Sequence, residues 1–316
     1  MTETPHAVVT GGAGFLGSHL VDSLLADGYR VTTLDNYGSG RPANLAHVES
    51  ERFESREHDV RDEFPDFDRV DEVYHMASRA SPDDFASHAV EIALTNSEGT
   101  RNAIECALAH DATLLLASTS EVYGDPEVHP QHEEYNGNVN VRGPRAPYDE
   151  SKRFGEALAV AYDQQYDVEV RTVRIFNTYG PRMRPDDGRV IPNFLSQALR
   201  GDDLTVYGDG TQTRSFCYVD DLIAGIRAVV AADRDVAGGD VFNLGNTEEG
   251  TILELAKAVL DVVDTESEIT HEPLPQDDPE VRRPDISKAT GALEWEPSVG
   301  LADGLERTVA AFEESE

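Results

Sequence analysis

Lysine, cysteine and long apolar runs are all scarce in this chain of 316 residues. Its two cysteines, Cys106 and Cys217, lie far apart without a CxxC spacing. The sequence therefore indicates neither a disulfide framework nor a zinc site, and we expect no bound metal. Such cysteine usage is typical of a reducing cytoplasm, which is the expected location. No uninterrupted apolar run reaches about 18 residues, so we expect no membrane-spanning helix and no membrane partner.

Positive charge is also scarce. The chain has 26 lysines and arginines against 61 aspartates and glutamates, and three of the basic residues are lysines. The formal net charge of −35 is spread along the whole chain and would repel phosphates, so we expect no nucleic-acid partner. One interpretation is an ordinary acidic enzyme. The other is a halophilic protein for a very salty cytosol, where screening weakens self-repulsion, and the shortage of lysine favours it.

Short apolar runs alternate with amphipathic stretches through the first half of the chain. This alternation is typical of βαβ units and predicts an α/β fold with a mostly parallel sheet. The expected strands are 7–9, 31–34, 70–76, 113–117 and 168–175, and the expected helices are 15–25, 92–109 and 151–166. After residue 175 the pattern changes to a loop rich in glycine, proline and arginine, followed by helices 190–199, 220–230 and 252–263 and strands 205–207 and 241–244.

The first expected strand runs into a glycine-rich turn with the spacing GxxGxxG. Gly11 permits the sharp turn, Gly14 lets the backbone approach a pyrophosphate, and Gly17 lets the next helix pack closely on the strand. The pyrophosphate would lie at a helix N-terminus, where free N–H groups favour anions. Asp35 ends the second strand, and its carboxylate can accept both ribose hydroxyls while repelling a 2′-phosphate. The pattern predicts NAD binding, against the alternative of a tight turn without a ligand.

These features predict a Rossmann-type doubly wound parallel sheet with a smaller, discontinuous α/β substrate domain. We assign residues 1–176 and about 216–245 to the NAD-binding domain. Residues of about 177–215 and 246–316 would form the substrate domain.

Tyr148 and Lys152 form a YxxxK pair on one face of the helix that opens after Pro147. An ammonium group beside a phenol favours the phenolate and lowers its pKa. A tyrosine tuned in this way could act as general base toward a sugar or alcohol hydroxyl while a hydride leaves. The alternative is a surface tyrosine–lysine pair, because YxxxK alone is common by chance.

The expected strand 113–117 ends in a run of hydroxyl and acidic side chains. Ligands bind at the carboxyl ends of strands in such sheets, so Thr119 could hydrogen-bond a reacting oxygen there. Glu121 would place a carboxylate in the same crevice, or it could simply cap a helix or face solvent.

The turn from Gly11 to Gly17, the Tyr148–Lys152 pair and Thr119 resemble the extended short-chain dehydrogenase/reductase superfamily of nucleotide-sugar enzymes. Longer stretches are similar to the UDP-glucuronate decarboxylase, or UDP-xylose synthase, family. They are 115–131, 148–153, 174–183, 187–190, 206–216, 282–286 and 295–297.

The resemblance implies roles for individual residues, with NAD as the cofactor and a nucleotide sugar as the substrate. The implied catalytic residues are Thr119, Glu121, Tyr148 and Lys152. The implied cofactor contacts are Gly11, Gly14, Phe15, Leu16, Gly17, Asp35, Asn36, Gly40, Asp59, Val60, Ser78, Tyr148, Lys152 and Thr178. The implied substrate contacts are Asn177, Arg189, Tyr207 and Arg214. Arginines suit a diphosphate and a uronate carboxylate in an otherwise acidic protein.

The implied activity is a carboxy-lyase reaction, the conversion of UDP-glucuronate to UDP-xylose through a 4-keto intermediate. A nucleotide-sugar 4-epimerase and a dTDP-glucose 4,6-dehydratase are the alternatives. The dehydratase usually has an aspartate beside the glutamate, where this chain has Ser120. A non-catalytic NAD-sensing regulator would have no reason to combine Tyr148, Lys152 and Thr119.

The helices 92–109 and 151–166 carry more apolar and small residues than one sheet face requires. In the superfamily such helices form a four-helix seam, so we expect a homodimer. The chain departs from the family pattern at Arg79 and Asp83, where prolines are usual, and at Leu94, which is often lysine.

Overall fold

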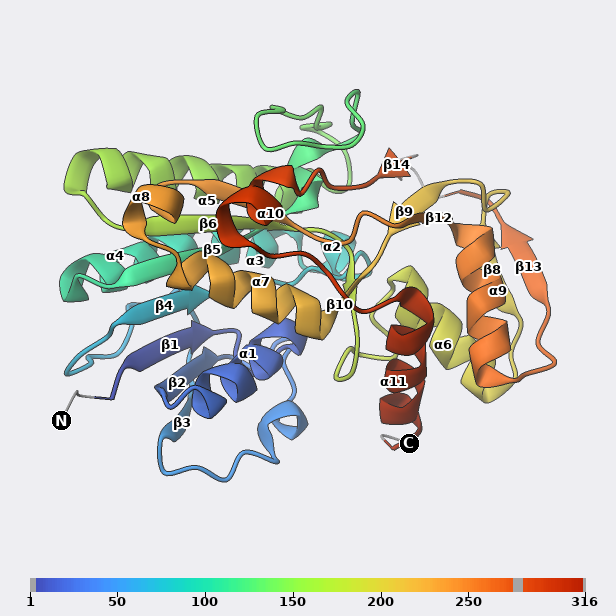
Figure 1. The fold of residues 1–316 in the computed structure, drawn as a ribbon, viewed down its shortest axis with the longest axis horizontal. Coiled ribbons are helices and arrows are strands. Elements are labelled where there is room, and N and C mark those ends of the chain that lie inside the picture. The colour runs from blue at the N-terminus through green and yellow to red at the C-terminus, as the bar shows by residue number, and fades with distance from the viewer. Residues whose placement is uncertain (1–3, 275–280, 315–316) are drawn as a thin grey trace.

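A seven-stranded parallel sheet forms the centre of the protein (Figure 1). The computed structural model describes residues 4–274 and 281–314. In spatial order the strands are β11 (Val241–Leu244), β6 (Val170–Ile175), β5 (Thr113–Thr119), β4 (Glu72–His75), β1 (His6–Thr10), β2 (Arg30–Asp35) and β3 (Phe53–Glu57). The strand order reverses between β1 and β4, and a ligand cleft is expected at the carboxyl ends of these strands. The predicted doubly wound sheet is confirmed.

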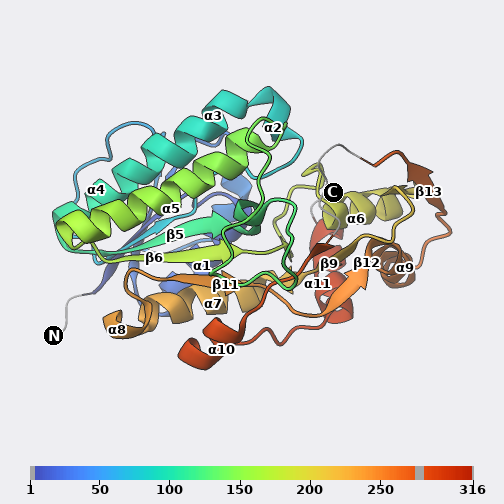
Figure 2. The same cartoon turned by 90° about the horizontal axis from the view of Figure 1, so that it is seen from above.

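Helices cover both faces of this sheet, so its central strands are almost wholly buried. One face carries α1 (Phe15–Ala26) and α7 (Val219–Ala231). The other carries α4 (Thr100–His110) and α5 (Ala146–Tyr166), which lie side by side in Figure 2. Strand β3 was not predicted, because its sequence FESRE lacks an apolar pattern. It lies at the sheet edge, where charged side chains are tolerated.

The helix expected at 92–109 is longer than predicted and is interrupted. It consists of α3 (Ala89–Leu94), a π-helical stretch (Thr95–Gly99) and α4. Ser97 Oγ donates to the carbonyl of Ala93 at 2.7 Å, and Thr100 Oγ1 donates to the carbonyl of Asn96 at 2.7 Å. Hydroxyls that bond back to the preceding turn compete with the helical ladder, and they accompany the bulge here.

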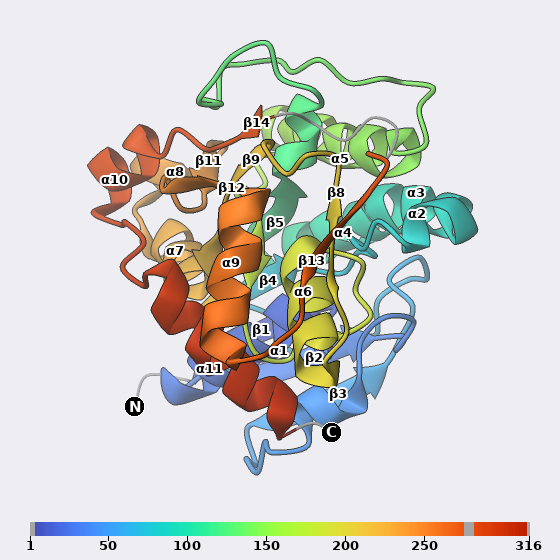
Figure 3. The ribbon, with the colours of Figure 1, turned by 90° about the vertical axis from the view of Figure 1, so that its right-hand side faces the viewer.

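The second half of the chain builds a smaller unit beside the carboxyl ends of the strands (Figure 3). Its helices are α6 (Val190–Arg200), α9 (Ile252–Val263) and α11 (Leu301–Glu313). Its strands are β8 (Leu204–Tyr207), β9 (Thr213–Ser215), β12 (Glu249–Thr251), β13 (Ile269–Glu272) and β14 (Val281–Arg282). Strand β8 pairs with β13, and β9 lies between β12 and β14.

The chain passes back to the large sheet between these pieces. Short strands β7 (Thr178–Tyr179) and β10 (Cys217–Tyr218) pair at the junction of the two units, and α7, α8 (Arg234–Ala237) and β11 follow. Later, α10 (Ser287–Leu293) packs beside β11, and Trp295 lies against Gly225 of α7, where a Cβ would come within 2.8 Å of the indole. No helix in the described ranges is long and apolar enough to cross a membrane.

Candidate active site

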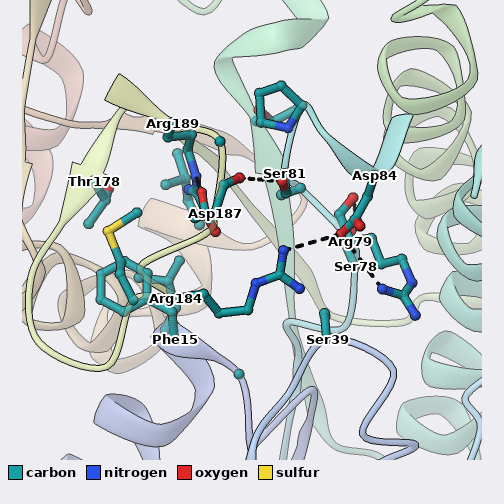
Figure 4. Close-up of a pocket in the computed structure, with 18 of the residues that line it drawn as sticks. Phe15, Ser39, Ser78, Arg79, Ser81, Asp84, Thr178, Arg184, Asp187 and Arg189 are labelled. Atoms are coloured by element: carbon teal, nitrogen blue, oxygen red, sulfur yellow. Dashed lines mark hydrogen bonds and ion pairs between the residues drawn. The ribbon is translucent and has the colours of Figure 1, made fainter. Parts of the chain in front are cut away.

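One cavity of about 450 Å³ lies where the carboxyl ends of the strands face the smaller unit. All of the sequence-predicted site residues except Asp59 line it. Figure 4 shows part of this cavity, with Thr178, Arg184 and Arg189 on the left and Ser78, Arg79 and Asp84 on the right. The structure therefore brings the predicted cofactor, catalytic and substrate residues to a single site.

The glycine turn between β1 and α1 fits a nucleotide phosphate because it leaves room for no side chain. Gly11 has a φ of +67°, and a Cβ there would lie 2.8 Å from the Ala77 Cα. A Cβ on Gly17 would lie 2.1 Å from the Gly11 carbonyl oxygen. The turn brings backbone close to the cavity at the N-terminus of α1, where the first N–H groups of the helix have no partner within the helix.

Asp35 is buried at the end of β2. Its Oδ2 accepts from the Ala13 N–H at 2.9 Å, and its Oδ1 accepts from the Tyr37 N–H at 2.8 Å. Burial raises the pKa of Asp35, and the two backbone donors partly offset this. A Cβ on Gly40 would lie 2.8 Å from each carboxylate oxygen, so glycine keeps that side of the carboxylate open. This arrangement fits an NAD ribose with free hydroxyls and disfavours a phosphorylated one.

Asp59 lies beside the cavity and not in its lining. Its carboxylate pairs with Arg61, which holds the pKa of Asp59 well below its usual range, and it accepts from Asn36 Nδ2 at 3.1 Å. Asn36, which donates to Asp59, does line the cavity.

The YxxxK pair lies on the buried face of α5. Lys152 Nζ donates to the Ala117 carbonyl at 2.8 Å, and burial lowers the pKa of Lys152 to about 8. Tyr148 is 6% exposed and forms a hydrogen bond with Thr119. Thr119 Oγ1 also accepts from the Glu121 N–H at 3.2 Å, which fixes the hydroxyl at the end of β5.

The expectation of a lowered phenol pKa does not hold for this site without a ligand. Burial raises the pKa of Tyr148 to about 12, against the opposing effects of the Thr119 hydrogen bond and the Arg189 charge. Lys152 makes its hydrogen bond with a backbone carbonyl and is not among the groups that lower the tyrosine pKa. A cationic ligand in the cavity would favour the phenolate.

Glu121 is held between two arginines. Arg145 Nη2 lies 2.7 Å from one carboxylate oxygen, and Arg282 binds both oxygens, the longer contact being 3.1 Å. Although burial alone would raise the pKa of Glu121, the two arginine charges lower it to about 2. Glu121 is thus a fixed anion and not a proton donor at neutral pH.

Asp149, next to the tyrosine, is a second buried carboxyl at this cluster. It is 5% exposed, and its Oδ1 has no hydrogen-bond partner. Burial and the negative charge of Glu121 raise the pKa of Asp149 to about 7, against the charges of Arg145 and Arg282. The sequence analysis missed Asp149, because nothing in its spacing distinguishes it from a surface acid in the first turn of a helix.

The predicted substrate residues also line this cavity. Arg189 pairs with Asp187, and Asn177 Nδ2 donates to the Ser215 carbonyl at 3.4 Å. Arg214 is 8% exposed and donates to the Thr213 carbonyl at 2.8 Å. Tyr207 is 44% exposed at the end of β8. Together these side chains place cations and a ring within one cavity.

Comparisons with known proteins decide the family. The model of the NAD dependent epimerase/dehydratase family matches residues 7–245. The chain belongs to this family. It is 50% identical over 306 residues to UDP-glucuronic acid decarboxylase 1 of Danio rerio, covering 96% of this chain and 72% of that protein. It is 51% identical to UDP-glucuronic acid decarboxylase 1 of Arabidopsis thaliana, covering 96% and 69%.

Solved structures of this family share the fold. UDP-glucuronic acid 4-epimerase from Bacillus cereus, in complex with UDP-glucuronic acid and NAD, is 29% identical with a TM-score of 0.88, covering 98% of this chain and 100% of that one. A dTDP-glucose 4,6-dehydratase from Streptomyces venezuelae, with NAD bound, is 31% identical with a TM-score of 0.87, covering 98% and 97%. This epimerase/dehydratase family member is an NAD-dependent enzyme.

The three residues that depart from the family pattern, Arg79, Asp83 and Leu94, differ in their position relative to the cavity. Arg79 lines the cavity and pairs with Glu91 at 2.8 Å, whereas Leu94 ends α3 and is not in the cavity lining. Asp83 lies against Gly188, where a Cβ would be 2.6 Å from the aspartate Cγ.

Within the described ranges of this family member, no three histidine, cysteine, aspartate or glutamate side chains cluster in a way that could hold a metal ion.

Several cavity residues had no assigned role at the sequence level. They are Arg145, Arg282, Phe85, Arg79 and Arg184. A signal was present, because nearly all the basic side chains of this acidic, lysine-poor family member are arginines, and several of them fall in loops. Their positions depend on contacts between distant segments, which periodicity does not predict.

Proposed function

We propose that this protein decarboxylates UDP-glucuronate to UDP-xylose with NAD. The observation that carries the proposal is the identity of about 50%, over 96% of the chain, with proteins named UDP-glucuronic acid decarboxylase. The epimerase and dehydratase neighbours are 28–31% identical. The shared cavity of Tyr148, Lys152, Thr119 and several arginines supports the same reaction.

Gly11, Gly14, Gly17 and Asp35 would hold NAD, which when bound accepts a hydride from C4 of the sugar and returns it at the end of the cycle. Tyr148 takes the proton of the C4 hydroxyl as that hydride leaves. A cationic cofactor ring, when bound, would favour the phenolate, and Lys152, fixed by the Ala117 carbonyl, keeps a second cation in the same cavity.

The sugar then carries a ketone at C4, β to its C6 carboxylate. The C5–C6 bond breaks, carbon dioxide leaves, and the electron pair passes through C5 into the C4 oxygen. Thr119 and protonated Tyr148 donate to that oxygen and stabilise its negative charge. A proton from solvent would then add to C5, Tyr148 would return its own proton to O4, and the hydride would return from the cofactor to C4, so the reaction is redox-neutral.

The dehydratase alternative conflicts with the state of Glu121. A dehydratase must protonate a leaving hydroxyl, and Glu121 is kept ionised by Arg145 and Arg282. Its neighbour Ser120 is a poor acid. We therefore infer that Glu121 orients the two arginines toward the anionic substrate, whose diphosphate and carboxylate match guanidinium groups.

Incubation with UDP-glucuronate and NAD in molar salt tests the proposal directly. We expect carbon dioxide and UDP-xylose in equal amounts, with no net accumulation of NADH. The two products are measured by gas trapping and by mass spectrometry of the nucleotide sugar. Formation of UDP-galacturonate without carbon dioxide would instead support the epimerase, and a failure to convert any nucleotide sugar would support the NAD sensor.

We also propose a homodimer formed through α3, α4 and α5. Five large apolar side chains on these helices are strongly exposed: Val90, Leu108, Phe154, Val160 and Tyr166 at 40–74%. Contiguous apolar side chains of this kind mark an interaction surface, and four such helices from two copies would bury them.

Replacing both Phe154 and Val160 by glutamate is expected to dissociate the dimer, because two buried charges would face two more across the seam. Light scattering in high salt should show the mass falling from about twice the chain mass to one chain. Val236, 41% exposed on α8, gives the matched control Val236→Glu, which should remain a dimer. A monomeric wild-type protein would contradict the proposal.

The acidic, lysine-poor composition leads us to propose a halophilic enzyme of a saline cytoplasm.

We further propose that the chain is divided into an NAD-binding domain of residues 1–176 and about 216–245, and a nucleotide-sugar domain of about 177–215 and 246–316. In the structure α10 packs beside the sheet of the first domain, so the boundary is crossed once more near the C-terminus.

A further inference from the structure

The segment 79–85, here called the crossing segment, passes over the cavity between β4 and α3. At one end Arg79 lies against the loop that follows Asp35, where a Cβ on Gly38 would come within 2.7 Å of Arg79 Nη2. At the other end Phe85 stacks on Tyr148, with ring centroids 5.0 Å apart and planes at 21°. The crossing segment therefore reaches from the ribose carboxylate to the tyrosine, the same span as the proposed dinucleotide site.

The middle of the crossing segment is fastened to the loop before α6. Asp84 Oδ2 lies 3.8 Å from Arg184 Nη2 of that loop and 3.6 Å from Arg79 Nη1 of its own segment (Figure 4). Ser81 Oγ donates to the backbone carbonyl of Asp187, and both residues are buried. Side chains from the two halves of the protein thus meet above the cavity.

The ion pairs of this connection are shielded from salt. The side chains of Asp84, Arg79 and Arg184 are 13%, 14% and 24% exposed. Screening acts mainly on exposed charges, so these pairs keep their strength in concentrated salt better than surface pairs do. The segment has a second anchor at Glu91, which holds Arg79 from α3.

We propose that Asp84 and Arg184 are cofactor-retaining residues, whose ion pair fastens the crossing segment over the dinucleotide and slows its release. The inference deepens the proposed function, because a reaction that takes up and returns its own hydride gains from a cofactor that stays bound between turnovers. Ser81 serves the same purpose through its bond to Asp187. If the Asp84–Arg184 pair and the Ser81–Asp187 bond were broken, the crossing segment could move away from the loop before α6. The part of the cavity between Asp35 and Tyr148 would then be exposed.

Dissociation of NAD tests the proposal without any sugar substrate. The protein is loaded with radiolabelled NAD in molar salt, freed of excess and chased with unlabelled NAD. Asp84→Asn and Arg184→Gln should each raise the dissociation rate by about 10-fold, which corresponds to a lost interaction of about 1.4 kcal/mol. The double variant should be no faster than Asp84→Asn alone, because the pair that Arg184→Gln removes is one of the two arginine pairs that Asp84→Asn removes.

Matched controls come from an exposed pair of the same residue types, Arg200 and Asp202, whose atoms lie 3.0 Å apart. Arg200→Gln and Asp202→Asn should release NAD at the wild-type rate. Ser81→Ala is the milder variant, expected to raise the rate about threefold and to fold normally by circular dichroism, since it removes a single hydrogen bond.

Unchanged or slower release in Asp84→Asn and Arg184→Gln, or rate increases that multiply in the double variant, would overturn the proposal. Because no uronate is present, this outcome is independent of the decarboxylase assignment. A wild-type protein that holds NAD but releases no carbon dioxide from UDP-glucuronate would contradict the proposed function and leave the inference intact.

Discussion

Tyr148→Phe is expected to lower the turnover of UDP-glucuronate by about 10³-fold, because general acid–base catalysis by one positioned group typically contributes 10²–10⁴-fold. In the proposed reaction the phenol accepts the C4 proton, and its hydroxyl bonds with Thr119 at the end of β5. The variant keeps the ring, so its stacking on Phe85 is preserved. Release of carbon dioxide under saturating NAD and substrate measures the effect.

The variant should still bind NAD with nearly wild-type affinity, since the glycine turn and Asp35 are unchanged. Calorimetric titration with NAD checks this. Tyr162→Phe is the matched control, because Tyr162 is on the same helix and its hydroxyl donates to Glu105 at 3.1 Å at the surface. Turnover in Tyr148→Phe close to that of Tyr162→Phe would remove the assigned role.

Glu121→Ala is expected to lower both turnover and stability. Arg282 is 4% exposed, and loss of its carboxylate leaves a buried charge with one partner fewer. Removing one member of a buried ion pair costs about 3–5 kcal/mol in the free energy of unfolding. We expect turnover to fall by about 10²-fold, because Arg145 and Arg282 lose the anion that orients them, by analogy with other positioned electrostatic groups.

Denaturant unfolding in molar salt measures the stability difference. Glu127→Gln at the exposed surface controls for the loss of one negative charge and should unfold like the wild type. Glu121→Gln preserves the shape and some hydrogen bonding, so its stability should lie between the two. An alanine variant as stable as the control would mean that solvent, and not Glu121, balances the two arginines.

The carboxylate of Glu121 also makes the free energy of unfolding depend on pH. The pKa of Glu121 is lowered from 4.5 to about 2 in the folded protein. Its stabilising contribution is therefore fully present above about pH 4.5 and is lost as the pH falls through about 2. The difference in unfolding free energy between wild type and Glu121→Ala should shrink over that interval.

The fold was predictable from the sequence wherever one local pattern decided the structure. The glycine turn, Asp35 at the end of β2 and the helix with Tyr148 and Lys152 all came from spacing and alternation. The π-helical stretch at Thr95–Gly99 was not, because its hydroxyl bonds and its packing on α5 break a periodicity that the residues otherwise fit. Strand β3 was missed because its edge position removes the apolar signal.

The chemistry of the site was less predictable than its location. The YxxxK spacing suggested that lysine lowers the tyrosine pKa, yet burial dominates, and Lys152 points to the Ala117 carbonyl. The arginines at Glu121 come from the turn before α5 and from β14, and no local pattern connects them to residue 121. Burial and long-range pairing are properties of the assembled chain, so neither could be read from spacing.

The separation of Glu121 and Arg282 by 161 residues bears on the order in which the enzyme is made. The ribosome makes Glu121 and the helix that carries Tyr148 well before it makes Arg282. Until that moment Glu121 lacks its bidentate partner. The growing chain can thus gain the glycine turn and the tyrosine helix first, while the full charge cluster around Glu121 waits until Arg282 has been made.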